Sequence, residues 1–411
     1  MPAELICGLK FPGRARMFSK IDEAMQRYVD DEILPGVSYQ ILKGSEIVHA
    51  GQMGYADIES KTPLQDDAIY RIASNTKLMT SVVLMMLYER GSFDLNDPLA
   101  NYLPEFTDML VLPKDAARIE DATPAANPIL IRHLLSHSAG LSYGFVEPDS
   151  IIDQAYNAAS LGGLAGIDTD LETYTLALAR LPLAFEPGSG WRYSVATDVC
   201  ARLVEVLSGQ KFDVCLAKML LEPLGLIDTG FFVPEDKISR LTTLYTPVHP
   251  FEPMKSGLTV APMFGERAST QKPKFLSGGG GLVSTLPDYS RFIQMIINDG
   301  HWGGRRYLLP ETLKLMRENQ LAEGVVVNFP FWPMPGTVFG LGFALKEKPS
   351  EAESALAVNE YHWGGLMGTH SWIAPQADIA ALCFTQRFPG FWHPYSHEFK
   401  RLVYEAAEIG F

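Results

Sequence analysis

The chain has 411 residues and a formal net charge of −14, with 47% hydrophobic and 20% charged residues. This composition is typical of a soluble globular chain with a sizeable core, and the acidic balance argues against nucleic acid and anionic membranes as partners. No apolar run is long enough to span a bilayer, and residues 1–10 lack the segments of a signal peptide, so we expect a cytoplasmic location.

The cysteines give little sign of chemistry. They are scattered, with no C-x-x-C pair, at Cys7, Cys200, Cys215 and Cys383. We expect small buried hydrophobic residues in a reducing compartment, with a free catalytic thiol as the alternative.

Hydrophobic periodicity predicts strands at both ends of the chain and helices between them. The elements expected first are a helix at 15–33, strands at 37–42 and 47–55 with Gly44 at their turn, an extended segment at 69–72 and a helix from Ser74 to about 90. The helices expected in the middle lie at 129–136, 171–181, 197–207 and 212–220. The strands expected after residue 275 lie at 282–284, 338–345, 360–363, 370–373 and 379–385, with helices at 287–299 and 396–408. Segments 104–128 and 146–168 are predicted to be inserted loops.

The simplest packing makes one sheet from both ends of the chain and covers it with the first and last helices. This arrangement predicts a discontinuous α/β domain, residues 1–90 and 271–411, and a mostly helical domain, residues 91–270. Ser74 would then lie on the seam between the domains, where clefts usually form.

The first candidate motif is Ser74-Asn75-Thr76-Lys77, where an extended segment passes into the long apolar run. A helix starting at Ser74 places the hydroxyl and the amine on one face. A serine hydroxyl becomes a good nucleophile when a neighbouring base takes its proton. A lysine with the ordinary pKa of about 10.4 is protonated, but burial and nearby positive charge favour the neutral amine. The alternative is a serine that caps the helix beside a solvated lysine.

The Ser-x-x-Lys spacing also occurs at Ser208/Lys211 and Ser269/Lys272. Ser208 is followed by Gly209, which predicts a helix end, and Ser269 lies in a polar segment that predicts a loop. Neither of these pairs opens a buried helix, so Ser74 is the better candidate.

Two further motifs support this choice. Tyr193, in the segment 187–194, is delivered by turn residues to the start of a helix and could pass protons, or it could simply pack its ring at a boundary. The segment His362-Trp363-Gly364-Gly365-Leu366 places two glycines in a strand. Such glycines mark a close approach to the backbone, by a substrate carbonyl or at a bulge.

In this order the three motifs resemble those of the class C β-lactamase-like serine hydrolases, and most closely those of the family VIII carboxylesterases. The resemblance extends from about residue 17 to 405 and includes the segment 134–141 and the glycine run 278–281. It implies a β-lactamase-like α/β (α+β) fold, in which an antiparallel sheet is flanked by the terminal helices and a mostly helical domain is inserted.

The resemblance also implies roles for individual residues. Ser74 would be the acylated nucleophile, and Lys77 and Tyr193 would form its base and proton relay. The backbone N–H groups of Ser74 and Leu366 would form the oxyanion hole. Trp363, Gly364 and Gly365 would border the substrate, and no cofactor or metal is implied.

Two departures from the β-lactamase pattern bear on the substrate. Val195 stands where the β-lactamases have an asparagine, and Trp363-Gly364-Gly365 aligns with their Lys-Thr-Gly, as in the carboxylesterases. An indole cannot pair with a substrate carboxylate as an ammonium does. Both changes favour a neutral, fairly apolar ester of short or medium acyl length over a β-lactam. An acyltransferase that uses an alcohol acceptor is the nearest alternative, a non-catalytic scaffold that only keeps the fold is a further one, and the oligomeric state stays open.

Three other patterns in the sequence are alternative candidates for a site or for its walls. Gly140-Leu-Ser142-Tyr143-Gly144 spells a nucleophile-elbow motif, but it follows a predicted helix where the elbow needs a strand. Ser142 is therefore predicted to be a non-catalytic turn residue, and Tyr143 and Phe145 are candidates for lining the acyl pocket. The histidines are predicted to be structural, because His133/His137 and His393/His397 lack the glutamate of H-E-x-x-H sites. The aromatic residues expected either to wall the cleft or to form an oligomer contact are Phe329, Phe331, Trp332, Phe388, Phe391 and Trp392.

Overall fold

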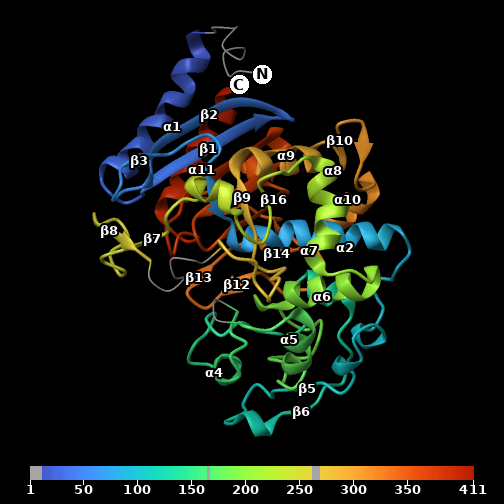
Figure 1. The fold of residues 1–411 in the computed structure, drawn as a ribbon. Coiled ribbons are helices and arrows are strands. Elements are labelled where there is room, and N and C mark those ends of the chain that lie inside the picture. Colours follow the sequence, from blue (N-terminus) through green and yellow to red (C-terminus); the bar gives the residue numbers. More distant parts are fainter. Residues whose placement is uncertain (1–11, 164–166, 262–268) are drawn as a thin grey trace.

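The computed structural model describes residues 12–163, 167–261 and 269–411 (Figure 1). Its largest sheet has eight strands in the order β14-β15-β16-β17-β18-β1-β2-β3, and every neighbouring pair is antiparallel. The strands are β1 (Gly36–Lys43), β2 (Glu46–Asp57), β3 (Thr62–Pro63), β14 (Thr337–Phe339), β15 (Ala344–Lys346), β16 (Glu360–Gly365), β17 (Thr369–Ala374) and β18 (Ile379–Phe384). The predicted sheet built from both ends of the chain is confirmed.

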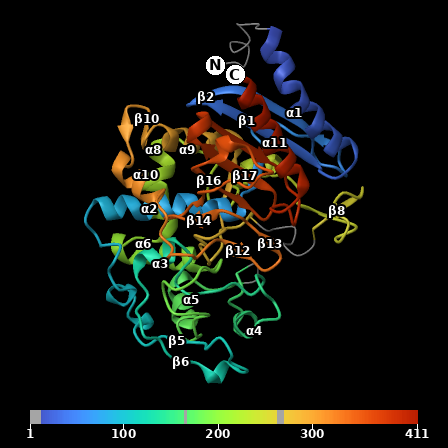
Figure 2. The same ribbon diagram turned by 180° about the vertical axis from the view of Figure 1, so that it is seen from behind.

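Two long helices cover the outer face of this sheet. They are α1 (Pro12–Asp30) and α11 (Pro394–Ile409), which lie side by side in Figure 2. Alternate side chains of the sheet, among them Tyr39 and Trp372, pack with Met25 and Phe399 of the two helices in one apolar core. The prediction that the first and last helices cover the sheet is therefore confirmed.

Helix α2 (Thr76–Glu89) runs through the centre of the molecule, between the sheet and the helices below it (Figure 1). Its residues 76–87 are all buried. A helix with no exposed face lies in the core of a large protein, which explains the unbroken apolar run in the sequence. Strand β4 (Ile69–Arg71) leads into this helix and pairs with β9 (Val283–Thr285). Helix α9 (Leu286–Ile297) follows β9 and packs on the inner face of the sheet.

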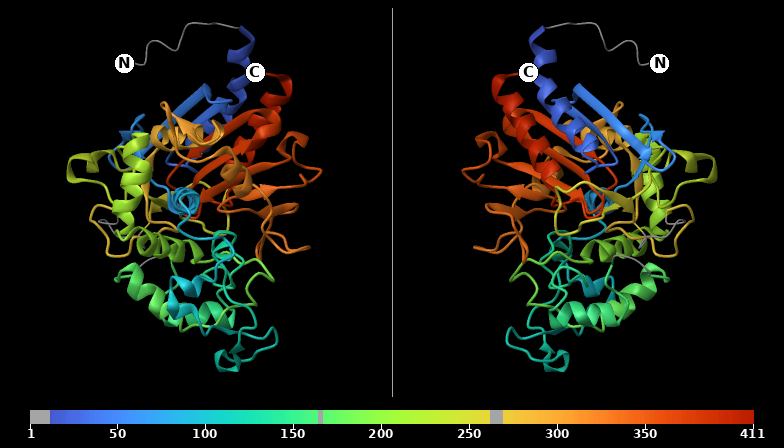
Figure 3. Two further views of the ribbon diagram at one scale, coloured as in Figure 1. Left: turned by 90° about the vertical axis from the view of Figure 1, so that its right-hand side faces the viewer. Right: turned by 90° about the vertical axis from the view of Figure 1, so that its left-hand side faces the viewer.

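Most of the regular structure between α2 and β9 is helical, and the segment lies on one side of the sheet (Figure 3). Its helices are α3 (Ile131–Leu135), α4 (Ile151–Ala158), α5 (Leu171–Leu178), α6 (Ala196–Ser208), α7 (Phe212–Leu216) and α8 (Glu222–Leu224), with a π-helical turn at Ala217–Leu221. Short strand pairs are formed by β5 (Leu110–Val111) with β6 (Thr123–Pro124) and by β7 (Tyr245–Pro247) with β8 (Leu258–Val260). Helix α6 packs on α2, so the core of the helical segment continues into the core beneath the sheet.

The remaining elements lie between α9 and the sheet strands at the end of the chain. They are β10 (His301–Trp302), β11 (Arg305–Arg306), α10 (Pro310–Met316), β12 (Asn328–Phe329) and β13 (Trp332–Pro333).

Several sequence predictions are wrong in detail. The strand expected at 338–345 is a hairpin of β14 and β15, because Gly342 turns the chain with a φ of +96°. The segment 146–168, predicted to be a loop, contains helix α4. The hydroxyl of Ser150 caps this helix by accepting from the Asp153 N–H, and Ile152 and Tyr156 form its buried face. The strands β7 and β8 were also not expected.

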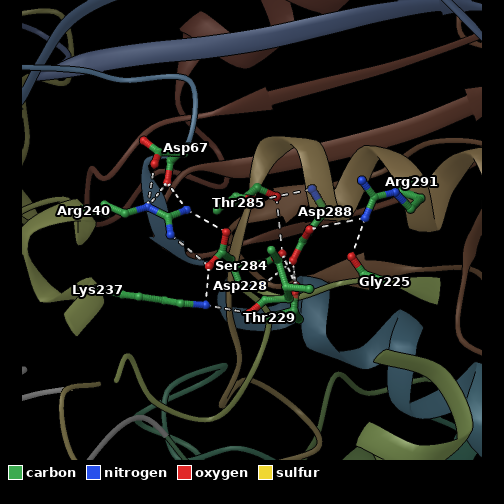
Figure 4. Close-up of polar contacts among 11 residues, drawn as sticks. Asp67, Gly225, Asp228, Thr229, Lys237, Arg240, Ser284, Thr285, Asp288 and Arg291 are labelled. Carbon is green, nitrogen blue, oxygen red and sulfur yellow. Dashed lines mark hydrogen bonds and ion pairs between the residues drawn. The ribbon is translucent and has the colours of Figure 1, made fainter. Parts of the chain in front are cut away.

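A network of ion pairs and hydrogen bonds lies beside the β4–β9 pair (Figure 4). It joins Asp228 and Arg240, in the segment before β9, to Asp67, which precedes β4, and to Asp288, which follows β9. Arg240 binds both carboxylate oxygens of Asp228, at 2.6 and 2.9 Å, and the carboxylate of Asp67 at 2.8 Å. Asp288, in the first turn of α9, accepts from the backbone N–H of Asp228 at 2.8 Å. Burial raises the pKa of Asp228, but the ion pairs with Arg240 and Lys237 outweigh it, so the pKa lies below its ordinary value. The network therefore anchors the chain at Asp67, just before β4, the strand that leads to Ser74 and α2.

Within the described ranges, no helix has the length and apolar character required to cross a membrane. Cys200, Cys215 and Cys383 are buried and unpaired, as predicted, and Cys7 lies outside the described residues.

His393 makes stability depend on pH in a defined direction. Its Nδ1 accepts from the N–H of Tyr395 at the start of α11, and its Nε2 lies 2.8 Å from the carbonyl oxygen of Pro253, so the neutral ring satisfies both bonds. Burial, helped by the charge of Arg387, lowers its pKa to about 4. Between pH 6.5 and 4 the unfolded chain binds a proton that the folded chain does not, so the free energy of unfolding falls as the pH falls.

We therefore predict that His393→Asn, which keeps a capping side chain, flattens this dependence by up to about 1.4 kcal/mol per pH unit. Urea unfolding at pH 4.5, 5.5 and 6.5 measures it, with the exposed His301→Asn as control. An unchanged slope in His393→Asn would contradict the assignment.

Candidate active site

Ser74 lies in a sharp turn between β4 and α2. A 3₁₀ turn, Ala73–Asn75, precedes the α-helix. The helix begins at Thr76, so the predicted start at Ser74 is two residues too early. Ala73 has a φ of +44°, in the left-handed region that L-residues rarely adopt, so the backbone is strained beside Ser74. The turn keeps Ser74 and Lys77 on one side of the helix start, as the spacing predicts.

Lys77 is 2% exposed, yet its amino group has three hydrogen-bond partners. Its Nζ donates to the carbonyl oxygen of Gly279 at 2.6 Å, to the hydroxyl of Tyr143 at 2.9 Å and to Ser74 Oγ at 3.4 Å. Nζ also lies 4.6 Å from the ring centroid of Tyr193 and 5.2 Å from that of Tyr143. Three acceptors match the three donors of an ammonium, and the two rings add cation–π attraction.

Tyr193 lies on the other side of Ser74. Its hydroxyl donates to Ser74 Oγ at 2.6 Å, and the indole N–H of Trp363 donates to the Tyr193 oxygen at 3.3 Å. The three side chains predicted to carry the chemistry, Ser74, Lys77 and Tyr193, are therefore in direct contact although 119 residues separate the first from the last.

The glycine run supplies a backbone bridge beneath Lys77. The Gly279 N–H donates to Asp198 at 2.9 Å, and the hydroxyl of Ser277 donates to the same carboxylate at 2.6 Å. Burial raises the pKa of Asp198, and the charge of Lys77 opposes that shift. A Cβ at Gly279 would lie 2.9 Å from Asp198 and 3.0 Å from the Tyr143 hydroxyl, so only glycine fits here without displacement.

The glycines of β16 allow two close approaches. A Cβ at Gly365 would overlap the carbonyl oxygen of Ile72, and one at Gly364 would lie 2.9 Å from His370 Nδ1. The predicted close approach to this backbone is therefore confirmed, and at Gly365 the approaching group is the chain just before Ser74. The turn after β16 is fixed by the Gly390 N–H, which donates to the Leu366 carbonyl at 2.7 Å.

Ser74 and Tyr193 border a cleft in which many of the lining side chains are aromatic. The cleft is lined by Ala73, Ser74, Tyr143, Phe145, Gly163, Tyr193, Ser277, Gly279, Gly280, Phe329, Trp363, Gly364, Leu366, Met367, Phe391 and Trp392. Among the residues that the structure describes, no side chain of Asp, Glu, Lys, Arg or His lines it. Of the predicted substrate-binding residues, Trp363, Gly364 and Leu366 border the cleft, and Gly365 faces Ile72 instead.

The loop aromatics divide between the cleft and its surroundings. Phe329, Phe391 and Trp392 line the cleft. Phe331 is 52% exposed and contacts the ring of Trp392, and Trp332 packs on His397. Of the six aromatic residues expected either to wall the cleft or to form an oligomer contact, Phe329, Phe391 and Trp392 wall the cleft.

Three residues around Lys77 were not predicted from the sequence to be part of its hydrogen-bonded environment. Tyr143 was expected only to line the pocket, and its hydroxyl contacts Lys77. Asp198 and Gly279 complete the polar environment. The sequence signal for Asp198 was an acidic residue in the first turn of α6, between the apolar residues Ala196 and Val199, where it is buried.

The alternative sites are used otherwise. Ser142 is buried, does not line the cleft, and bonds to Asp153 and Arg192, as expected of a non-catalytic serine. Ser208 ends α6 beside Gly209, as predicted. His137 is buried with its Nδ1 3.1 Å from Ser194 Oγ, and burial, with the charge of Lys77, holds its pKa well below the ordinary value. No group of three His, Cys, Asp or Glu within the described ranges could hold a metal ion.

Comparison with known proteins agrees with this geometry. The model of the Beta-lactamase family matches residues 21–404, and the chain belongs to this family of serine hydrolases. Esterase EstB of Burkholderia gladioli is 30% identical over 379 residues, which cover 88% of each chain. An uncharacterized protein of Mycobacterium tuberculosis is 31% identical over 373 residues, 89% of each chain.

A solved structure extends the likeness to three dimensions. EstCE1, described as a hydrolase with promiscuous acyltransferase activity, superposes with a TM-score of 0.82 at 26% identity, covering 96% of this chain and 100% of that one. The family and fold predicted from the motifs are confirmed.

The contact between Gly365 and Ile72 gives a testable prediction. Gly365→Ala forces β16 away from the turn that carries Ser74, because the new Cβ meets backbone and cannot be relieved by a side-chain rotation. We expect a loss of about 1–3 kcal/mol in the free energy of unfolding. Gly230→Ala is the matched control, because its Cβ would meet only an ordinary contact at 3.8 Å. Equal urea midpoints for the two variants would contradict the close approach.

Proposed function

We propose that the protein is a serine carboxylesterase that hydrolyses neutral esters of short or medium acyl length through an acyl-enzyme on Ser74. The observation that supports this most is the position of Ser74 Oγ, 2.6 Å from the Tyr193 hydroxyl and 3.4 Å from Lys77 Nζ, on the wall of an uncharged cleft. The similarity to Esterase EstB supports the same reaction.

The first half-reaction follows from these contacts. In the reacting form the pair of Lys77 and Tyr193 holds one proton fewer than an ammonium and a phenol together. Ser74 Oγ then attacks the ester carbonyl carbon while its proton passes to the Tyr193 oxygen or to Lys77 Nζ. Both groups contact Ser74 Oγ, so either can take this proton. The tetrahedral intermediate then collapses, the bond from carbon to the alkoxy oxygen breaks, and the leaving alcohol takes the proton back.

The second half-reaction restores the enzyme. A water molecule gives a proton to the same pair and adds its oxygen to the acyl carbon. The bond to Ser74 Oγ breaks, the free acid leaves, and Ser74 regains its proton.

The oxyanion would be held by the backbone N–H groups of Ser74 and Leu366. Within the described part of the chain, neither N–H donates to a protein acceptor. Leu366 borders the cleft in a turn fixed by Gly390, and Ser74 lies in the first turn of a helical segment, where N–H groups are free. Donors fixed before reaction stabilise a developing charge without reorganisation.

The lining of the cleft supports an uncharged substrate. Trp363 offers an indole where a β-lactamase has its lysine, and Val195 is buried at the start of α6, where it offers no amide. A substrate carboxylate would lose its water shell in this cleft without gaining a cation. This reasoning favours esters over β-lactams and leaves β-lactam turnover at a trace level.

An acyltransferase is the second candidate, and the similarity to EstCE1 favours it as an additional activity. The chemistry differs only in the second half-reaction, where an alcohol replaces water. We further propose that the cleft is the seam between an α/β domain of residues 1–90 and 271–411 and a helical domain of residues 91–270, and that the enzyme acts without a cofactor in the cytoplasm.

A panel of p-nitrophenyl esters from acetyl to lauroyl tests the proposal. We expect the wild type to be fastest on the shorter esters, Ser74→Ala to lose at least about 10³-fold in kcat, and Tyr193→Phe to lose about 10²-fold or more. If Ser74→Ala keeps its activity while Ser142→Ala loses all of it, the nucleophile is misassigned.

Product analysis in the presence of a primary alcohol separates the two candidates. Free acid as the main product supports the esterase, because water then wins the acyl group. A transferred ester as the main product, at alcohol concentrations well below that of water, would replace the esterase by the acyltransferase.

A further inference from the structure

A buried polar cluster lies directly behind the two tyrosines of the site. It consists of Arg192, Ser142 and Asp153, with Glu147 at its outer edge. Asp153 has a fully buried side chain, and the side chain of Arg192 is 14% exposed. None of these residues lines the cleft, so the reaction described above does not use them.

The guanidinium of Arg192 has a different partner on each nitrogen. Nε donates to Ser142 Oγ at 2.6 Å, Nη2 to Asp153 Oδ1 at 2.8 Å and Nη1 to Glu147 Oε2 at 2.9 Å. Ser142 donates its own proton to Asp153 at 2.5 Å, and the second oxygen of Asp153 accepts from the Glu147 N–H at 2.7 Å. The planar fork of an arginine can make this set of bonds and a lysine cannot.

The cluster connects two segments that each continue into the site. Arg192 is followed by Tyr193, whose hydroxyl contacts Ser74, and Ser142 is followed by Tyr143, whose hydroxyl contacts Lys77. The ring centroids of Tyr143 and Tyr193 lie 5.2 Å apart. A backbone bond from the Val195 N–H to the Ser142 carbonyl joins the same two segments at 3.2 Å.

We propose that Arg192, acting through Ser142 and Asp153, is a positioning residue that sets the separation of Tyr143 and Tyr193 around Lys77 and Ser74. The proposal rests on the proposed function of Ser74. If the bonds of Arg192 are lost, the two segments can slide, and the Tyr193 hydroxyl moves relative to Ser74 Oγ. Misplacement by about 1 Å costs a reaction of this kind about a hundredfold.

A purely structural role would be a weaker explanation of the cluster. Buried ion pairs contribute little net stability compared with apolar residues of the same volume, because both partners lose their hydration. A cluster of charges at this place is better explained by the fixed geometry that directional hydrogen bonds impose.

The chain provides a matched control in Arg202. Its side chain is 17% exposed and pairs with the buried Glu205 at 3.1 Å and with the half-exposed Glu172 at 3.3 Å. The two arginines are therefore alike in exposure, and each pairs with one buried and one half-exposed carboxylate. Arg202 lies within α6 and adjoins no tyrosine of the site, so its replacement tests stability without the positioning effect.

The experiment compares Arg192→Lys, Ser142→Ala and Arg202→Lys with the wild type. Arg192→Lys keeps a cation opposite Asp153, and Ser142→Ala removes only the bridging hydroxyl, so both are chosen to fold. We expect kcat on p-nitrophenyl butyrate to fall at least tenfold in the first two, with KM within about twofold, and to stay within twofold of the wild type in Arg202→Lys. The rate at which a fluorophosphonate labels Ser74 should fall in parallel, and the double variant should lose no more than the worse single one.

Several results would overturn the inference. They are wild-type kcat and labelling rates in Arg192→Lys and Ser142→Ala, an equal loss in Arg202→Lys, and a loss confined to KM. An inactive wild type whose Ser74 is not labelled would refute the proposed function instead, and the two failures are thus distinguishable.

Discussion

The buried amino group of Lys77 is the constraint on which the rest of the site depends. Because Lys77 is only 2% exposed, its amino group must find its partners inside the protein, and here these are a backbone carbonyl, a phenol and the hydroxyl of Ser74. Each partner comes from a different part of the chain. The glycine run, the loop carrying Tyr143 and the start of α2 must therefore all be in place before the lysine is satisfied.

The backbone around this group is shaped so that the elements can approach. Gly279 leaves room for Asp198 and Tyr143, and Gly365 lets β16 touch the chain at Ile72. The strained residue Ala73 follows β4, and Asp67, which pairs with Arg240, precedes the same strand. A rigid base and a strained turn together present Ser74 to the cleft at a fixed angle, which is the kind of pre-organisation that catalysis requires.

Much of this could be predicted from the sequence, because local signals fix it. Alternating strands around Gly44, the apolar run of α2 and the paired glycines of β16 each carry a periodic or conformational signature. The hairpin at Gly342 was missed because apolar residues flank the turn on both sides, so that the segment resembles one continuous strand. Tyr143, 66 residues from Lys77, could be recognised as a contact only in three dimensions, since no local pattern encodes a long-range hydrogen bond. The predicted division into domains and the catalytic roles remain proposals.

The central claim is that Ser74 carries the acyl group, and peptide mass spectrometry of the trapped acyl-enzyme tests it most directly. The protein is mixed with an activated ester, quenched in acid within one turnover and digested. The account predicts a mass increase equal to the acyl group on the peptide that contains Ser74, and none in Ser74→Ala. An adduct on Ser142 or another residue, or full turnover with no adduct at any time point, would contradict it.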